Sequence, residues 1–373
     1  MKITKIKAVH VKVPLEKPYQ ISYGIVENAH AVVTQVFTDE GLVGIGEADP
    51  LPPFTAETWG SVFAAIEHYL GPRLIGSDPR NIAKANAMMD GVLGGNLLAK
   101  GAMDMALWDL AGKALGVPIS RLLGGQLRDT IPLLWPFGSG KPEEEEPRIR
   151  AKMEEGYRTF MIKAGALPID EDIARVRAIE DAFGGSININ VDANQGWNLS
   201  ETLDFMEGTK GCHLDFVEQP VHGHKLPAQE IIRARATHPL SADEGVQTVH
   251  QASALLRMNL VDIFSLKVSK NGGISRTHHI GQMARGFDVQ CLVNSMIELG
   301  ISQAAALQLA ASLPNLLPGG HCFMSTLRLV DDVTNFRDWL KDAVATVPDK
   351  PGLGIDLDES KLKTYGHESM VLK

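Results

Sequence analysis

The chain has 373 residues, of which 44% are hydrophobic and 22% are charged, and its formal net charge at pH 7 is −9. A chain of this length and composition can bury a large core and is expected to form two domains. The negative charge argues against a nucleic-acid partner, because no basic stripe can neutralise phosphates, and no apolar run is long enough to cross a membrane.

The N-terminal residues and the cysteines indicate the compartment. Residues 1–5 lead into alternating apolar residues and not into an apolar signal core, so we expect no secretion signal. Cys212, Cys291 and Cys322 are odd in number and scattered, which suits free thiols in a reducing environment. We therefore expect a cytoplasmic protein.

The first 50 residues are expected to form a meander of strands. Residues 3–13 alternate between apolar and polar side chains, and Pro14 and Pro18 are expected to end this strand. Residues 31–37 and 42–47 read as two further strands that flank a turn.

Helices are expected to follow this meander. Residues 58–70, 79–91 and 100–115 have helical spacing, and a Gly-Val-Pro sequence at 116–118 stops the last helix. Together with the strands, these helices predict a small α+β domain over residues 1–125.

A strand-then-helix pattern continues to about residue 330. Five short apolar runs each lead to a charged residue, and helical segments lie between them. The charged residues are spaced 29, 26, 25 and 24 residues apart, and they are Lys163, Asp192, Glu218, Asp243 and Lys267. One strand, one helix and two loops fill each interval, which predicts a parallel βα barrel. Because strand ends meet at one face of a barrel, these side chains are expected to share a pocket.

Three of these residues suit a hard divalent cation. Asp192, Glu218 and Asp243 offer the oxygen ligands that Mg²⁺ prefers, and Mn²⁺ could substitute for it. Lys163 and Lys267 flank them and are the expected acid and base, because shelter from water and a nearby dication lower a lysine pKa. A single acidic residue at a strand end is more often a helix cap, but five residues in step favour a shared site.

Longer motifs give the chain a family resemblance. They lie at residues 41–47, 102–113, 191–194, 217–220, 243–244, 267–273, 296–298 and 351–354. With them the chain resembles the enolase superfamily, and within it the muconate lactonizing enzyme (mandelate racemase/muconate lactonizing enzyme) subgroup, along its whole length.

The resemblance implies a fold and an assembly. The expected fold is α/β, with a modified (β/α)7β TIM-like barrel at residues 126–330 and the α+β domain at 1–125 as its cap. The segment at residues 331–373 is expected to return to the capping domain. A homo-oligomer, from dimer to octamer, is also expected.

The resemblance also implies a reaction. Proton abstraction beside a substrate carboxylate gives a high-energy enediolate, which Mg²⁺ on the three carboxylates would stabilise. Lys163 and Lys267 would face one another across the metal and allow proton transfer on opposite faces of the substrate. Capping-domain loops at residues 18–27 and 50–55 are expected to exclude water and to choose the substrate.

Supporting residues are expected around these groups. Asn194 and Glu244 are expected to orient the metal ligands without binding the metal. Glu298 has two readings: it hydrogen-bonds Lys267 or the substrate, or it caps a helix before residue 300. Lys270 is expected to begin the next loop or helix and to support the site.

Two other patterns are expected to have no chemical role. The acidic run at residues 143–146 follows a proline and predicts a solvated helix start. Four histidines, His213, His278, His279 and His321, are expected to be structural or exposed.

One departure from the family pattern bears on the substrate. The subgroup usually has Lys-x-Lys at the end of the second barrel strand, and here Met161 replaces the first lysine. One cation fewer weakens the case for dianionic substrates such as muconate and favours proline-like or betaine-like amino acids.

The resulting prediction is a Mg²⁺-dependent racemase or epimerase of a small carboxylate. Its substrate would be an amino-acid derivative that is proline-like, betaine-like or N-acylated. The alternative enzymes are a muconate-type cycloisomerase and a dehydratase that use the same enolate. The alternative from another class is a non-catalytic barrel protein.

Overall fold

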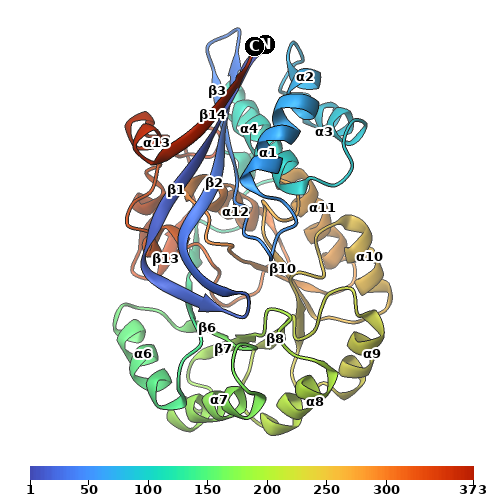
Figure 1. The fold of residues 1–373 in the computed structure, drawn as a ribbon, viewed down its shortest axis with the longest axis vertical. Helices are drawn as coiled ribbons and strands as arrows, with labels where there is room; N and C mark the ends of the chain where they lie inside the picture. The colour runs from blue at the N-terminus through green and yellow to red at the C-terminus, as the bar shows by residue number, and fades with distance from the viewer.

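The computed structural model describes residues 1–373, and an antiparallel sheet stands at the top of the molecule in Figure 1. Its strand order is β14-β1-β2-β3. The strands are β1 (Ile3–Ile21), β2 (Gly24–Thr38), β3 (Val43–Ala48) and β14 (Gly366–Leu372). Because β14 pairs with β1, the last residues of the chain lie beside the first.

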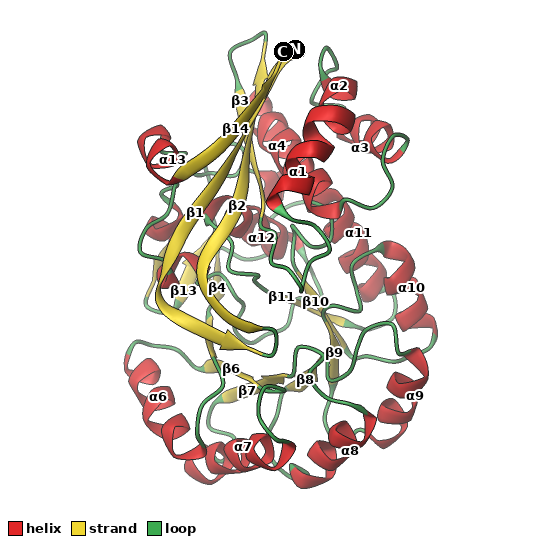
Figure 2. Cartoon of the chain, in the orientation of Figure 1, coloured by secondary structure: helices red, strands yellow, loops and turns green.

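Strand β1 is longer than the sequence indicated. The prediction that Pro14 and Pro18 end it is wrong: the pairing with β2 shifts register between Pro14 and Tyr19 and then continues to Ile21. A bulge tolerates proline because it leaves residues outside the hydrogen-bonded ladder. Strands β1 and β2 therefore form one long hairpin, and its tip reaches down to the barrel (Figure 2).

Helices cover one side of this sheet. They are α1 (Trp59–Ala65), a π-helical turn η1 (Ile66–Leu70), α2 (Gly71–Leu74), α3 (Ile82–Asp90) and α4 (Leu97–Leu115). Helix α4 is buried along most of its length and packs directly on β3. A Cβ atom at Gly46 would lie 1.9 Å from the carbonyl oxygen of Ala102, so only glycine allows this approach.

Seven parallel strands form the curled sheet below, in the order β11-β10-β9-β8-β7-β6-β5. These strands are β5 (Leu134–Phe137), β6 (Thr159–Lys163), β7 (Asn188–Asp192), β8 (Phe216–Glu218), β9 (Leu240–Ala242), β10 (Ile263–Leu266) and β11 (Gln290–Val293). Helices wrap around the sheet in Figure 1, and they are α6 (Pro142–Glu154), α7 (Ile169–Phe183), α8 (Leu199–Gly208), α9 (Leu226–Arg235), α10 (Val249–Arg257), α11 (Ile274–Arg285) and α12 (Gly300–Ser312). This arrangement confirms the predicted fold class.

Residues 316–321 close the barrel between its two edge strands. Parallel bridges join Leu316 to Cys291 of β11 and His321 to Leu133, just before β5. The ring of His321 is buried and joins two elements: Nδ1 accepts from the backbone N–H of Val293 at 3.0 Å, and Nε2 donates to the carbonyl oxygen of Leu317 at 3.1 Å. Because Nδ1 accepts a backbone N–H, the ring proton must be on Nε2.

The remaining elements are short and lie beside the barrel or the cap. They are α5 (Ile119–Leu122), β4 (Thr130–Pro132), η2 (Ser325–Arg328), η3 (Phe336–Trp339), β12 (Leu340–Lys341), β13 (Val344–Thr346) and α13 (Glu359–Tyr365). Strands β12, β13 and β4 form a separate three-stranded sheet. No helix combines the length and the apolar character that a membrane crossing requires.

A buried carboxylate joins the cap to the barrel. Glu47 of β3 accepts hydrogen bonds from the backbone N–H groups of Leu299 at 2.7 Å and Ser302 at 2.9 Å. These groups lie at the start of α12, where no intrahelical acceptor exists. A side chain of the N-terminal domain therefore accepts the free backbone N–H groups at the start of barrel helix α12.

Candidate active site

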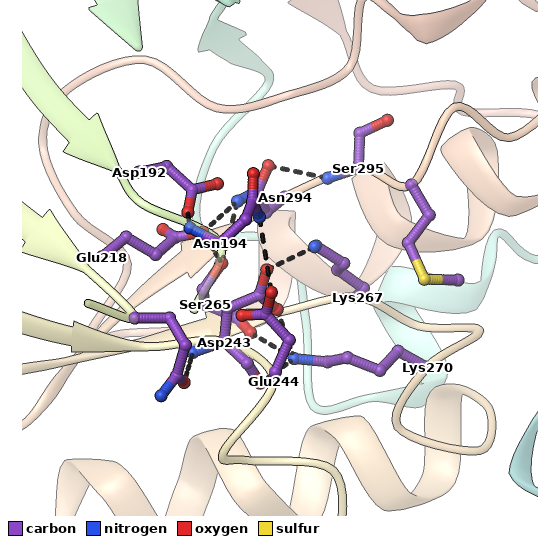
Figure 3. Close-up of polar contacts among 12 residues, drawn as sticks. Asp192, Asn194, Glu218, Asp243, Glu244, Ser265, Lys267, Lys270, Asn294 and Ser295 are labelled. Atoms are coloured by element: carbon purple, nitrogen blue, oxygen red, sulfur yellow. Dashed lines mark hydrogen bonds and ion pairs between the residues drawn. The ribbon is translucent and has the colours of Figure 1, made fainter. Parts of the chain in front are cut away.

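Three buried carboxylates gather at the carboxyl ends of neighbouring barrel strands. Asp192 and Glu218 end β7 and β8, and Asp243 directly follows β9. One oxygen from each lies within 4.8 Å of the others, and Figure 3 shows the three side chains converging. Burial raises the pKa of Glu218, and the charges of Asp192 and Asp243 raise it further. Such a cluster of negative charge is costly to bury without a compensating cation.

The cluster suits a divalent metal ion. Atom Oε2 of Glu218 is buried and has no hydrogen-bond partner, although buried polar atoms almost always have one. Three carboxylate oxygens match the ligand chemistry of hard cations such as Mg²⁺. The residues present therefore fit the cofactor that the family pattern implies.

Two lysines flank this cluster from opposite sides. Lys163 ends β6 and its Nζ pairs with Asp192, whereas Lys267 follows β10 and its Nζ pairs with Asp243. Burial lowers the pKa of both lysines, but the surrounding acidic groups together outweigh this, chiefly Asp192 for Lys163 and Asp243 for Lys267, so both pKa values lie above the usual range. With the carboxylates paired in this way, both lysines are ammonium ions.

A third lysine holds Asp243 from below. Lys270 donates from Nζ to Oδ1 of Asp243 at 2.7 Å, to its carbonyl oxygen at 2.6 Å and to the carbonyl oxygen of Ser265 at 3.0 Å. Burial acts to raise the pKa of Asp243, but Lys267 and Lys270 overcome it and hold that pKa well below its usual range. The contacts of Lys270 are all with Asp243 and the strand beside it (Figure 3).

Two neutral residues that sequence reasoning missed hold the central carboxylate. Asn294 donates from Nδ2 to Oε1 of Glu218 at 3.0 Å and to Oγ of Ser265 at 2.9 Å, and Ser265 donates to the same Glu218 oxygen at 3.3 Å. A signal was available, because Asn294 directly follows β11 just as Lys267 follows β10. Position at a strand end was informative even without a charge.

The tip of the cap hairpin reaches the loops beside the carboxylate cluster. Tyr23 donates from its hydroxyl to Oε1 of Glu244 at 2.8 Å and accepts from Nε2 of Gln195 at 2.7 Å. Asn194 donates from its backbone N–H to Oδ1 of Asp192 at 2.9 Å and from Nδ2 to Glu244 at 3.4 Å. Asn194 and Glu244 thus lie between the cap and the carboxylate cluster.

Glu298 makes its hydrogen bonds to the loop after β11 and to α12. Its carboxylate accepts hydrogen bonds from Oγ of Ser295 at 2.8 Å, from the backbone N–H of Met296 at 2.6 Å and from Nε2 of Gln303. It makes no hydrogen bond to Lys267, and the backbone at the start of α12 is capped by Glu47. Glu298 braces the loop that leads from β11 to α12.

A pocket above the carboxylates is walled by both the cap and the barrel. The cap contributes Tyr19, Ile21, Leu51 and Phe54, and the barrel contributes both lysines together with Met161, Asn294, Met324 and Arg328. The cavity volume is about 50 Å³, well below the ~300–1,000 Å³ of sites for drug-sized ligands.

Cationic side chains in this pocket stack on aromatic rings of the cap. The guanidinium of Arg328 lies 3.6 Å from the ring centre of Tyr19, and Nζ of Lys267 lies 4.3 Å from that of Phe54. Residues 18–27, expected as a loop, are instead mostly the paired ends of β1 and β2, so this wall of the pocket is a strand hairpin.

Comparison with known proteins covers nearly the whole chain. Residues 3–124 match the mandelate racemase / muconate lactonizing enzyme N-terminal domain, and residues 146–361 match the enolase C-terminal domain-like family. The chain is 31% identical to N-succinyl-L-Arg/Lys racemase of Bacillus cereus over 97% of each chain. The crystal structure of that racemase superposes with a TM-score of 0.95 over 100% of both chains.

Two other relatives have different activities. Identity is 34% to L-Ala-D/L-Glu epimerase of Bacillus subtilis, over 95% of this chain and 97% of that protein. It is also 34% to chloromuconate cycloisomerase CbnB of Cupriavidus necator, over 98% and 99%. With both domains matched and relatives aligned end to end, this chain belongs to the mandelate racemase/muconate lactonizing enzyme subgroup of the enolase superfamily.

Proposed function

We propose that this protein is a Mg²⁺-dependent isomerase that racemises or epimerises a small amino-acid derivative by removing and returning its α-proton. The observation that carries the proposal is the row of five charged groups, four of them buried and Lys163 partly buried, in which Lys163 pairs with Asp192 and Lys267 pairs with Asp243. Glu218 completes the row with an oxygen that has no partner. A non-catalytic barrel would have no reason to retain this costly arrangement of buried charges.

The roles of the residues follow from their positions. Asp192, Glu218 and Asp243 would hold the metal, whose positive charge stabilises the second negative charge of a carboxylate substrate that loses its α-proton. Lys163 and Lys267 approach the pocket from strands on opposite sides of the carboxylates. The lysine that is in its neutral form would therefore remove the proton from one face of the α-carbon, and the other lysine, as an ammonium ion, would return a proton to the opposite face.

The pocket supports a compact substrate. Its cavity of about 50 Å³ is small, and Met161 is an apolar wall where the family pattern has a lysine. The rings of Tyr19 and Phe54 face cationic groups of the protein, and such rings also attract a cationic substrate nitrogen. These features favour a proline-like or betaine-like amino acid, with N-acyl amino acids next.

A cycloisomerase or a dehydratase is the second candidate function. Chloromuconate cycloisomerases are among the relatives at 34% identity. Both reactions need one base for proton abstraction, whereas racemisation uses two residues on opposite faces. A homo-oligomeric state and a cytoplasmic location stay predictions of the sequence.

Hydrogen exchange with solvent tests the proposal. The protein with Mg²⁺ is incubated in D₂O with both enantiomers of proline betaine and N-succinyl amino acids and with cis,cis-muconate, and deuterium uptake and products are followed by mass spectrometry. Lys163→Ala and Lys267→Ala should each abolish racemisation. Each variant should still exchange the α-proton of one enantiomer, and the two variants should differ in which enantiomer that is.

The control is Lys361→Ala, which removes a lysine paired with Asp331 outside the site. It should leave both exchange rates unchanged. Exchange lost in only one of the two active-site variants would support the single-base reactions. Near wild-type turnover in both would show that neither lysine is the acid or base.

A further inference from the structure

A fully buried arginine lies behind Lys163, on the side away from the pocket. Arg175 of α7 donates from Nε to Oε1 of Glu145 at 2.7 Å and from NH1 to Oδ1 of Asp172 at 3.1 Å. The same NH1 atom donates to the backbone carbonyl oxygen of Lys163 at 2.8 Å. Arg175 therefore contacts the main chain of one of the two proposed acid–base residues.

Glu145 belongs to the acidic run that the sequence predicted to be solvated. That prediction is wrong at this residue, because Glu145 is completely buried and forms an ion pair with Arg175. A helical signal was present: Glu145 and Ile149 are four residues apart, share one face of α6, and are the buried residues of that helix.

Asp172 of this cluster and the neighbouring strand β7 hold the two peptide groups that follow Lys163. Asp172 accepts from the backbone N–H of Gly165 at 2.8 Å, and the backbone N–H of Ala164 donates to the carbonyl oxygen of Asp192 at 2.8 Å. Gly165 has φ of +79°, and a Cβ atom there would lie 2.4 Å from the carbonyl oxygen of Ala193. The main chain at the end of β6 is therefore held by Arg175, by Asp172 and by the end of the neighbouring strand β7.

Stability alone does not explain these charges. Burying an ion pair often costs as much as the attraction returns, so an apolar contact between α6 and α7 would stabilise the barrel equally well. A guanidinium offers something that an apolar side chain cannot: a rigid planar fork that directs hydrogen bonds to several acceptors at once. Here the acceptors are on α6, on α7 and at the end of β6.

Arg175 supports the main chain of Lys163 but not that of Lys267. Lys267, the other proposed acid–base residue, has its backbone N–H held by Oδ1 of Asn271 in its own loop at 2.9 Å. Arg175 has no contact with that loop, because its partners are Glu145, Asp172 and Lys163. A disturbance at Arg175 should therefore reach one face of the substrate and spare the other.

We propose that Arg175 is a positioning residue that, anchored by Glu145 and Asp172, aims Nζ of Lys163 at the α-carbon of the substrate. The inference rests on the proposed function, since it takes Lys163 as an acid–base residue. Misplacing a reacting group by 1 Å can lower a rate by about 100-fold. Replacing Arg175 should thus slow the proton transfer of Lys163 without weakening substrate binding.

The test compares Arg175→Met with Arg177→Met, a matched control on the same helix whose side chain is exposed and bonds only the carbonyl oxygen of Gly208. Exchange in D₂O is measured for each enantiomer of proline betaine, or of whichever other carboxylate of the panel turns over. The enantiomer that Lys163→Ala no longer exchanges should lose about 10-fold to 100-fold in rate. The mirror image should change by less than twofold, with KM unchanged for both.

Equal loss for the two enantiomers, or no loss, would overturn the proposal. Glu145→Gln, which keeps the size and one acceptor oxygen, serves if Arg175→Met does not fold, and it should show the same one-sided loss to a smaller degree. If Lys163→Ala itself leaves both exchanges intact, the proposed function fails whatever the Arg175 variant does.

Hydrogen exchange of backbone amides gives a readout that needs no substrate. In Arg175→Met the peptide that contains Ala164 and Gly165 should exchange faster, whereas the peptide that contains Lys267 should not change. Unchanged exchange at Ala164 and Gly165 would contradict the positioning role.

Discussion

Protonation of His321 should weaken the barrel at mildly acidic pH. This buried ring accepts the backbone N–H of Val293 and donates to the carbonyl oxygen of Leu317, so it joins β11 to the segment that closes the barrel. Burial lowers the pKa of His321 from 6.5 to about 4, partly opposed by the bond to Leu317. A second ring proton would bury a charge and break the bond from Val293.

The sign and size of the effect follow from linkage. Because the folded-state pKa lies below the unfolded value, the unfolded chain takes up a proton that the folded protein resists. The stability due to neutral His321 is full above about pH 6.5 and is lost as the pH falls toward 4. One pKa unit corresponds to about 1.4 kcal/mol, so this group should lower the free energy of unfolding by about 2 kcal/mol between pH 7 and pH 5.

The assay is urea unfolding of the wild type and of His321→Gln at several pH values between 5 and 7. Other buried groups titrate as well: burial raises the pKa of Glu47 to about 8, which favours the folded state as the pH falls. Only the difference between the two proteins therefore isolates His321. That difference should shrink by about 2 kcal/mol from pH 7 to pH 5, whereas exposed His250→Gln should show no such change. A difference that is constant with pH would refute the reasoning.

Three further outcomes are expected. Chelation with EDTA should abolish α-proton exchange and Mg²⁺ should restore it, and calorimetry should show that Glu218→Gln weakens metal binding; exchange that survives EDTA would contradict the metal site. Glu47→Ala leaves two buried N–H groups of α12 without an acceptor and should lower the free energy of unfolding by at least about 2 kcal/mol, whereas Glu47→Gln, which keeps an acceptor oxygen, should lower it less in the same urea titration. Met161→Lys adds a cation to the pocket and should raise the ratio of turnover on cis,cis-muconate to that on proline betaine, and an unchanged ratio would show that this position does not select substrate charge.

Residues at strand ends were predictable from the sequence because their positions repeat. A βα unit has a narrow range of lengths, so apolar runs about 25 residues apart indicated that Lys163, Asp192, Glu218, Asp243 and Lys267 would meet. Because they are charged residues that follow apolar runs, they could be recognised in the sequence as candidate site residues. Asn294 follows β11 as Lys267 follows β10, and Ser265 lies within β10, but neutral polar residues are common at such positions, so chemistry alone did not distinguish them.

Local rules failed where tertiary contacts decide the structure. Proline normally ends a strand, yet β1 continues past Pro14 and Pro18 because its pairing with β2 resumes after a change of register. A run of like charges is normally solvated, yet Glu145 is buried because Arg175, thirty residues away, meets it there. The pairing of β1 with β2 cannot be recognised from residues 14–18 alone, and the ion pair with Arg175 cannot be recognised from residues 143–146 alone.

The same distinction separates the chemistry of this enzyme from its specificity. The three carboxylates and both lysines lie at the ends of barrel strands, so sequence spacing alone indicated where they lie. The cap side of the pocket includes Tyr19 and Phe54, and its position depends on how the hairpin β1–β2 docks on the barrel. The bond from Tyr23 to Glu244 joins that docking to the residue next to Asp243, a proposed metal ligand. Relatives of about one-third identity can therefore share the carboxylates and still differ in substrate, because the cap wall can change without altering the strand ends.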